Sequence, residues 1–136
     1  MDKKKEIIRA IKKNIIPEVR SLGFVGNFPH FKKVENDSYY FIGFQFGRTH
    51  LIGKLVVELG FADKRKMSDL TKSIPEKKLN YGISQRSHRL GQKSEKEDGT
   101  WFDFQSLKTE EQMESLSLLI LDTFKKEYPE FIKSTT

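Results

Sequence analysis

The hydrophobic residues near the N-terminus recur every three or four positions, which is the spacing of one face of an α-helix. These residues are Ile7, Ile8, Ile11, Ile15, Val19 and Leu22. Asp2 can cap the start of this helix, and Gly23 can end it in a left-handed conformation. Because Pro17 has no N–H to donate within the helix, we expect a kink there, or a second short helix that begins at this proline.

The middle of the chain alternates between its two faces with a period of two, which is typical of β-strands. Residues 39–47 are apolar on both faces at first and therefore predict a central strand. Residues 51–62 have one apolar and one polar face, and the short link between the two segments favours a hairpin. Residues 28–35 predict an edge strand, because Pro29 cannot donate a hydrogen bond to a neighbouring strand.

The segment 63–78 is highly charged. It carries three apolar residues, Met67, Leu70 and Ile74, at helical steps, so we expect a short surface helix or a long loop. A further strand is predicted from Leu79, where apolar residues alternate again.

The segment 91–99 is rich in charged residues and turn formers, which predicts an exposed hairpin loop. Residues 100–105 then predict a last strand. Thr109 and Gln112 have the spacing of a capping box, at which a C-terminal amphipathic helix begins. We expect this helix to end before Pro129.

The predicted order is helix, about five strands, helix. Hairpin-length links between strands require antiparallel pairing, and two amphipathic helices most simply cover one face of such a sheet. The pattern therefore predicts a two-layer α+β fold. Because no linker or repeat divides the chain, we expect one domain over residues 1–136, with its ordered core at about 5–125.

The composition agrees with a small globular protein. Hydrophobic residues make up 36% of the 136 positions, and 11 Phe and 4 Tyr predict an aromatic core. Cysteine is absent, which excludes disulfides, thiolate nucleophiles and cysteine-bound metals. The basic N-terminus lacks the uninterrupted apolar stretch of a secretory signal, and no segment approaches the roughly 18 apolar residues of a spanning helix. We therefore expect a cytoplasmic protein without a membrane contact.

The formal net charge is +6 and the isoelectric point is about 9.4. Such a charge permits binding to a polyanion, although a surface of solvated lysines has the same charge. The excess is concentrated in residues 1–22, and Lys64, Arg65 and Lys66 form a second cluster. The aromatic strand at 39–47 superficially suits an RNA-binding sheet, but the element order and the glycine-aromatic motif of such a sheet are absent. Nucleic-acid binding is therefore the first alternative function.

No pattern in the sequence predicts a nucleophile or a metal site. The three histidines are His30, His50 and His88, and no two of them have a metal-binding spacing. Ser87 and His88 are a nucleophile and a base by type, but neighbours on a strand point to opposite faces. We expect no cofactor.

A metal-dependent enzyme that acts on a phosphate-containing substrate is the second alternative. It would need carboxylates and a lysine at the ends of adjacent strands. The candidates are Glu58, Asp63, Asp103 and Lys54. Charge at these positions is also expected of an ordinary polar strand face, and the chain has no glycine-rich phosphate loop. We therefore predict a protein without catalytic activity.

Several short motifs together resemble one known family. They are the helix end Leu22-Gly23-Phe24, the strand pair YYFIGFQFGRTHLIGKLVVELGF, the stretch Arg89-Leu90-Gly91, the acidic loop after it, and the pair Trp101-Phe102. In this order they resemble the bacterial family called domain of unknown function 4304, over about residues 5–125. Phe102 stands where relatives favour a second tryptophan. The resemblance implies an α+β domain, and it implies no activity and no catalytic residues.

The sequence SQRSHRLG, residues 84–91, ends the predicted strand with three basic residues. Strand alternation places Gln85, Ser87 and Arg89 on one face and Arg86 and His88 on the other. In one interpretation the strand leaves the sheet here, and its arginines pair with acids of the next loop, namely Glu95, Glu97 or Asp98. In the other, the sheet continues past its covering helices and leaves a cleft lined by one of the two rows.

We predict that the protein binds a partner through this basic face. The candidate residues are Arg86, His88, Arg89, Lys64, Arg65 and Lys66. Arginine pairs with carboxylate or phosphate through two parallel hydrogen bonds, so the expected partner is an acidic protein or another anionic surface. An immunity protein, which binds another protein and has no catalytic signature, is one example of such a module.

Overall fold

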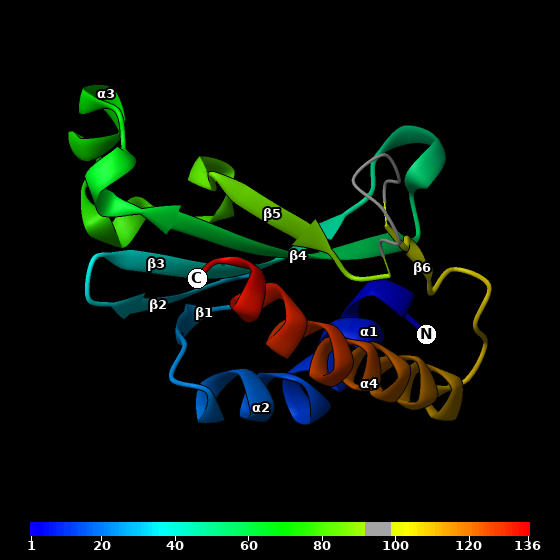
Figure 1. Ribbon diagram of the computed structural model, residues 1–136. Coiled ribbons are helices and arrows are strands. Elements are labelled where there is room, and N and C mark those ends of the chain that lie inside the picture. The colour runs from blue at the N-terminus through cyan, green and yellow to red at the C-terminus, as the bar shows by residue number, and fades with distance from the viewer. Residues whose placement is uncertain (92–98) are drawn as a thin grey trace.

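One antiparallel sheet of six strands forms the centre of the molecule (Figure 1). The computed structural model describes residues 1–91 and 99–136. The strands are β1 (Val25–Asn27), β2 (His30–Glu35), β3 (Ser38–Phe46), β4 (Lys54–Asp63), β5 (Arg86–Arg89) and β6 (Phe102–Asp103). They lie in the order β1-β2-β3-β4-β5, and β6 pairs with β4 beyond the residues that pair with β5.

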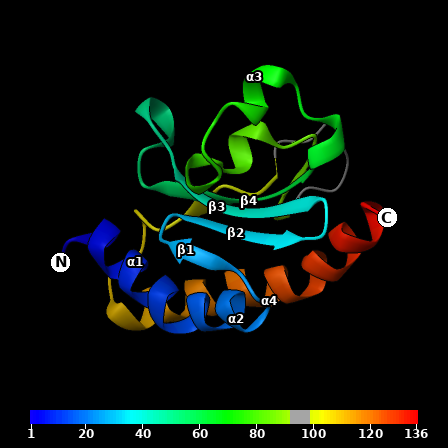
Figure 2. The ribbon, with the colours of Figure 1, turned by 90° about the vertical axis from the view of Figure 1, so that its left-hand side faces the viewer.

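Three helices lie on one side of this sheet (Figure 2). They are α1 (Lys3–Asn14), α2 (Ile16–Ser21) and α4 (Glu110–Ser134). The predicted break is confirmed, because Pro17 lies in the first turn of a separate α2. Gly23 follows α2 with a φ of +96°, the left-handed conformation that ends a helix. Thr109 and Gln112 form the predicted capping box at the start of α4.

The main hydrophobic core lies between these helices and the sheet. Ile42 of β3 and Leu55 and Leu59 of β4 face it and are almost completely buried, as their alternation predicts. Ile11 of α1 and Phe124 of α4 meet them from the helix side. The prediction of an α+β fold, with N- and C-terminal helices on one face of an antiparallel sheet, is confirmed. We call this side of the sheet the helix face.

The opposite side, the outer face, carries a smaller layer that the sequence did not predict (Figures 1 and 2). It consists of residues 64–85, which include the short helix α3 (Asp69–Lys72) and the 3-10 helices η2 (Lys64–Lys66), η3 (Glu76–Lys78) and η4 (Tyr81–Ile83). A second hydrophobic cluster joins this layer to the sheet. Its buried members are Tyr39, Phe41, Ala62 and Leu79.

Two strand predictions need correction. The strand expected from Leu79 begins only at Arg86, because the side chain of Asn80 accepts a hydrogen bond from the N–H of Gly82 and closes the turn of η4. The strand expected at the sheet edge is β2, and it is not at the edge because β1 pairs with its other side. Pro29 precedes β2, so the strand loses no hydrogen bond to it.

Helix α4 continues through Pro129 to Ser134, contrary to the expected end. Beyond the proline, Phe131 is buried and Ile132 packs against the main core. The burial of these two side chains offsets the one hydrogen bond that a proline inside a helix removes. This extra turn matters for the site, because it brings the end of α4 beside β5.

The last strand is shorter than expected, and the loop before it is only partly described. Of residues 100–105, only the two residues of β6 form a strand. The loop expected at 91–99 lies, except for its two ends, outside the described residues. Within the part of the chain that the structure describes, no helix has the length and apolar character needed to cross a membrane.

Candidate anion-binding groove

Strand β5 carries three of the predicted site residues and directs them to two sides of the sheet. In the register with β4, Arg86 lies opposite Phe61 and His88 lies opposite Leu59, so both project to the helix face. Ser87 and Arg89 project to the outer face. The expectation that Ser87 and His88 point in opposite directions is confirmed, and the two predicted rows do not combine into one basic face.

His88 is held by helix α4. Its Nε2 donates to Oε1 of Glu127 over 2.6 Å, and its ring lies against Phe131 with centroids 6.3 Å apart. The same carboxylate oxygen accepts the backbone N–H of Gly91 at 2.9 Å. His88 therefore serves to attach β5 to the helix layer, and its hydrogen-bonding nitrogen is not available to a ligand.

Arg89 is engaged on the outer face. Its Nε lies 3.7 Å from Oε1 of Glu58, and its guanidinium lies over the Trp101 ring, 5.8 Å from the centroid. The loop acids that the sequence offered as its partners lie outside the described residues. Glu58 and Trp101 already account for the position of this side chain, so we leave Arg89 out of the candidate site.

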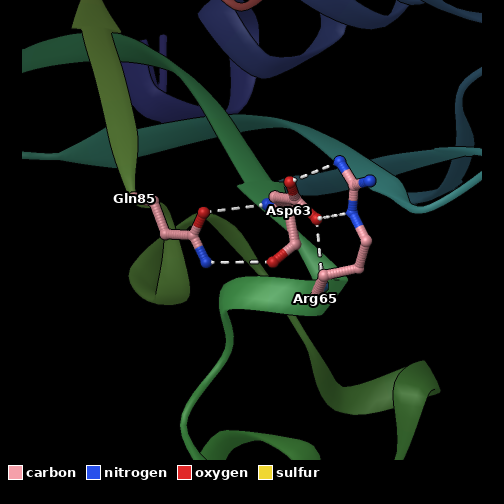
Figure 3. Close-up of polar contacts among 3 residues, drawn as sticks. All are labelled: Asp63, Arg65 and Gln85. Carbon is pink, nitrogen blue, oxygen red and sulfur yellow. Dashed lines mark hydrogen bonds and ion pairs between the residues drawn. The ribbon is translucent and has the colours of Figure 1, made fainter.

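Arg65 is bound to Asp63 at the end of β4 (Figure 3). Its Nε and Nη2 donate to the two carboxylate oxygens at 3.1 and 2.9 Å, and its backbone N–H donates to Oδ1 at 2.9 Å. The Gln85 amide bonds both the N–H and the C=O of Asp63, at 2.9 and 3.1 Å. This arrangement fixes the start of β5 against the end of β4.

The hydrogen bonds from the side chain and backbone of Arg65 lower the pKa of Asp63 below its ordinary value of about 4. A carboxyl group with a lowered pKa stabilises the fold at pH values above 4, and this stabilisation is lost as the pH falls through the lowered pKa. At pH 7 we expect Asp63→Asn to melt a few degrees below the wild type. The difference should shrink as the pH falls below 4 and disappear once Asp63 is protonated in the folded protein.

Thermal melts followed by circular dichroism across this pH range test the prediction. Asp122→Asn removes an exposed carboxylate from α4 and is the matched control, with an expected shift below about 1 °C at every pH. A difference between wild type and Asp63→Asn that stays constant down to pH 2 would contradict the role of the charge.

Arg86 differs from the other predicted arginines, because it is exposed and pairs with no carboxylate of the described residues. It lines an open groove of about 580 Å³ together with Lys66. The remaining lining residues come from β4, from the start of β5 and from the end of α4. They are Phe61, Asp63, Gln85, Ser134, Thr135 and Thr136.

The polar groups of the groove are not equally available. The hydroxyls of Ser134 and Thr135 donate to helix carbonyls at 2.6 and 2.7 Å, and Thr136 does the same at 2.9 Å. Asp63 and Gln85 are bound to each other and to Arg65, as described above. Among the groove residues, Arg86 and Lys66 are therefore the side chains that could recognise an anion. Lys64, the last predicted residue, lies on the outer side, with its ammonium 4.8 Å from the Tyr39 ring centroid.

Three of the eight residues that line the groove could not be found from the sequence. Ser134, Thr135 and Thr136 lie beyond the proline at which the helix was expected to end. Glu127, which positions β5, is one acid among many on α4, and no local motif distinguishes it. The basic clusters include Arg86 and Lys66, which line the groove, but the pattern could not show that Arg65 and His88 are bound internally.

The three carboxylates considered for catalysis are each engaged elsewhere, and Lys54 lies opposite Asp103 in the register of β4 and β6. Glu58 pairs with Arg89, Asp63 with Arg65, and Asp103 accepts the backbone N–H of Gln105 at 2.9 Å. Among residues 1–91 and 99–136, no three histidine, aspartate or glutamate side chains gather where a metal ion could bind. The described residues therefore give no arrangement that we assign to a reaction.

Comparison with curated proteins and with solved structures finds no significant match. Comparison with protein families finds one match, the domain of unknown function DUF4304, over residues 15–129. This range covers most of the chain, from the end of α1 to the last turns of α4, and includes every strand of the sheet. The protein belongs to the family of domains of unknown function DUF4304.

Proposed function

We propose that the protein is a small binding module without catalytic activity, and that it holds an acidic segment of a protein partner in the groove between β5 and the end of α4. The observation that carries the proposal is the state of Arg86. Its guanidinium pairs with no carboxylate of the described residues, whereas Arg65, His88 and Arg89 each have an acidic partner. An arginine of this kind can form two parallel hydrogen bonds to a carboxylate.

The form of the groove favours a protein segment over a small anion. Small anions are usually held by several convergent donors, often backbone N–H groups. In this groove the three hydroxyls donate elsewhere, and the end of α4 presents carbonyl groups, which repel anions. Arg86 and Lys66 lie on an open surface, which suits an extended acidic segment. Such a segment can make its remaining contacts with the residues around the groove.

We expect Arg86→Ala to weaken the binding of a short poly-glutamate peptide about tenfold, because one bidentate charged contact is lost. Lys66→Ala should weaken binding about threefold, since a lysine makes a single charged contact. Titration of the ¹⁵N-labelled protein with the peptide, followed by NMR, measures the affinity and identifies the residues whose resonances shift. The shifts should cluster at Lys66, Gln85, Arg86 and Thr135.

Lys108→Ala is the matched control. It removes one exposed positive charge just before α4, at the opposite end of a 25-residue helix from the groove. It should leave the affinity unchanged within a factor of two. Peptide binding that Arg86→Ala does not affect would overturn the proposal. A groove that binds single-stranded RNA but not poly-glutamate would instead support the nucleic-acid alternative.

A further inference from the structure

Residues 64–78, which we call the basic arm, form the most prominent projection on the outer face of the sheet (Figures 1 and 2). The arm contains η2, α3 and η3. Within the described part of the chain, it connects the end of β4 to η4 without joining the sheet. A projection of this kind meets another surface before the rest of the outer face does.

The arm is anchored through two of its three apolar residues. Met67 and Ile74 pack against the second hydrophobic cluster, and Nζ of Lys32 in β2 donates to the backbone oxygen of Glu76. Helix α3 has only four residues, so the helical spacing of the sequence does not extend over the whole segment. As a result Leu70 is not on the same side as Met67 and Ile74.

Leu70 is 79% exposed, more than any other large hydrophobic residue of the described chain. It lies in α3, at the far end of the arm from the sheet (Figure 1). An exposed leucine in isolation is ordinary. Leu70 differs from such a residue because it lies at the end of an anchored projection, within a strongly basic segment.

The arm carries six basic and two acidic side chains, a formal charge of +4 in a chain whose total is +6. Asp63, which precedes the arm, neutralises Arg65. Lys72, Lys77 and Lys78 are exposed, and none of them pairs with a carboxylate among residues 1–91 and 99–136. The positive charge therefore lies in the same projecting segment as Leu70, with Lys72 in α3 and Lys77 and Lys78 in η3.

This chemistry fits an anionic lipid surface better than a nucleic acid or a protein. The arm has no aromatic residue, so it cannot stack on unpaired bases. A convex projection would need a matching socket in a protein partner. A bilayer needs no socket, since acyl chains accept an apolar side chain while lysines reach the headgroups. The expected absence of a membrane contact rested on the lack of a spanning helix, and a surface contact does not need one.

We propose that the basic arm binds the surface of an anionic bilayer, with Leu70 inserted at the acyl boundary and Lys72, Lys77 and Lys78 at the headgroups. The proposal does not rest on the groove, although Lys66 belongs both to the arm and to the groove lining. It predicts co-sedimentation with vesicles of phosphatidylcholine that contain about one-third phosphatidylserine, and little binding to vesicles of phosphatidylcholine alone. Binding should also decrease steeply with salt.

Leu70→Ser should lower the partition coefficient about tenfold, and Lys77→Gln with Lys78→Gln about twentyfold. Leu70→Trp should raise it severalfold, because tryptophan prefers the membrane interface. This gain cannot result from a folding defect. Val25→Ser is the matched control, since Val25 is 62% exposed on β1 and lies outside the arm. It should leave the partition coefficient unchanged.

Absence of binding to phosphatidylserine vesicles at low salt would overturn the proposal. Binding that Leu70→Ser and Leu70→Trp both leave unchanged would also overturn it, because the leucine would then take no part. An arm that retains single-stranded RNA in a lysine-dependent way, without binding vesicles, would assign it to nucleic acid instead.

Discussion

Gly43→Val should lower the free energy of unfolding by about 3 kcal/mol, although valine forms strands more readily than glycine. Gly43 lies in the central strand β3 and faces the outer layer. A Cβ at this position would lie 2.1 Å from Cδ1 and 2.4 Å from Cε1 of Tyr81, whose ring covers the glycine and packs against His30. The ring would have to move away, and η4 would lose its contact with the sheet. Urea denaturation measures the loss.

The matched control is Gln45→Val, two residues further along the same strand and on the same face. Gln45 is exposed, so valine should change the free energy of unfolding by less than about 0.5 kcal/mol there. A double-mutant cycle separates crowding from strand propensity. If Tyr81 is the obstacle, Gly43→Val should cost about 2 kcal/mol less in a Tyr81→Ala background. Additive effects of the two substitutions would contradict the contact.

The main layer of the fold follows from local patterns, because each of its elements satisfies its own periodicity. The stripe that includes Ile11 forms α1, the two-sided apolar strand forms β3, and the capping box of Thr109 and Gln112 starts α4. The outer layer was not predicted, because the alternating residues after Leu79 were interpreted as a strand, and alternation alone does not show that a segment joins a sheet. Tyr81 and Ile83 alternate, yet the turn at Asn80 makes that segment a 3-10 helix whose side chains pack onto the sheet.

Which residues line the candidate groove was harder to predict from the sequence than the presence of basic residues near it. Whether a basic residue is available to a partner depends on which carboxylate the fold places beside it. For Arg65 that carboxylate is close in sequence, at Asp63, but for His88 it is Glu127 on the last helix. A single sequence records no such long-range pairing. The groove residues at the end of α4 are in place only because α4 continues past Pro129. Tertiary packing, and not helix propensity, determines that continuation.

Glu127→Ala should lower the free energy of unfolding by about 2 kcal/mol. The substitution removes the acceptor of two hydrogen bonds, from Nε2 of His88 at 2.6 Å and from the N–H of Gly91 at 2.9 Å. Hydrogen bonds to a charged group contribute about 1.5–3 kcal/mol each, and less where water can replace them. The His88 and Glu127 side chains are each 24% exposed, so part of the loss is recovered by solvation.

Two further variants distinguish this attachment from a general effect of charge on α4. Glu130→Ala removes a carboxylate of the same helix that is 76% exposed and lies 3.8 Å from Lys133. It should change the free energy of unfolding by less than about 0.5 kcal/mol. Glu127→Gln keeps a neutral acceptor and should have an intermediate effect, near 1 kcal/mol. If urea denaturation shows Glu127→Ala to be as stable as Glu130→Ala, water replaces both hydrogen bonds at no cost, and β5 does not depend on this contact for its position beside the groove.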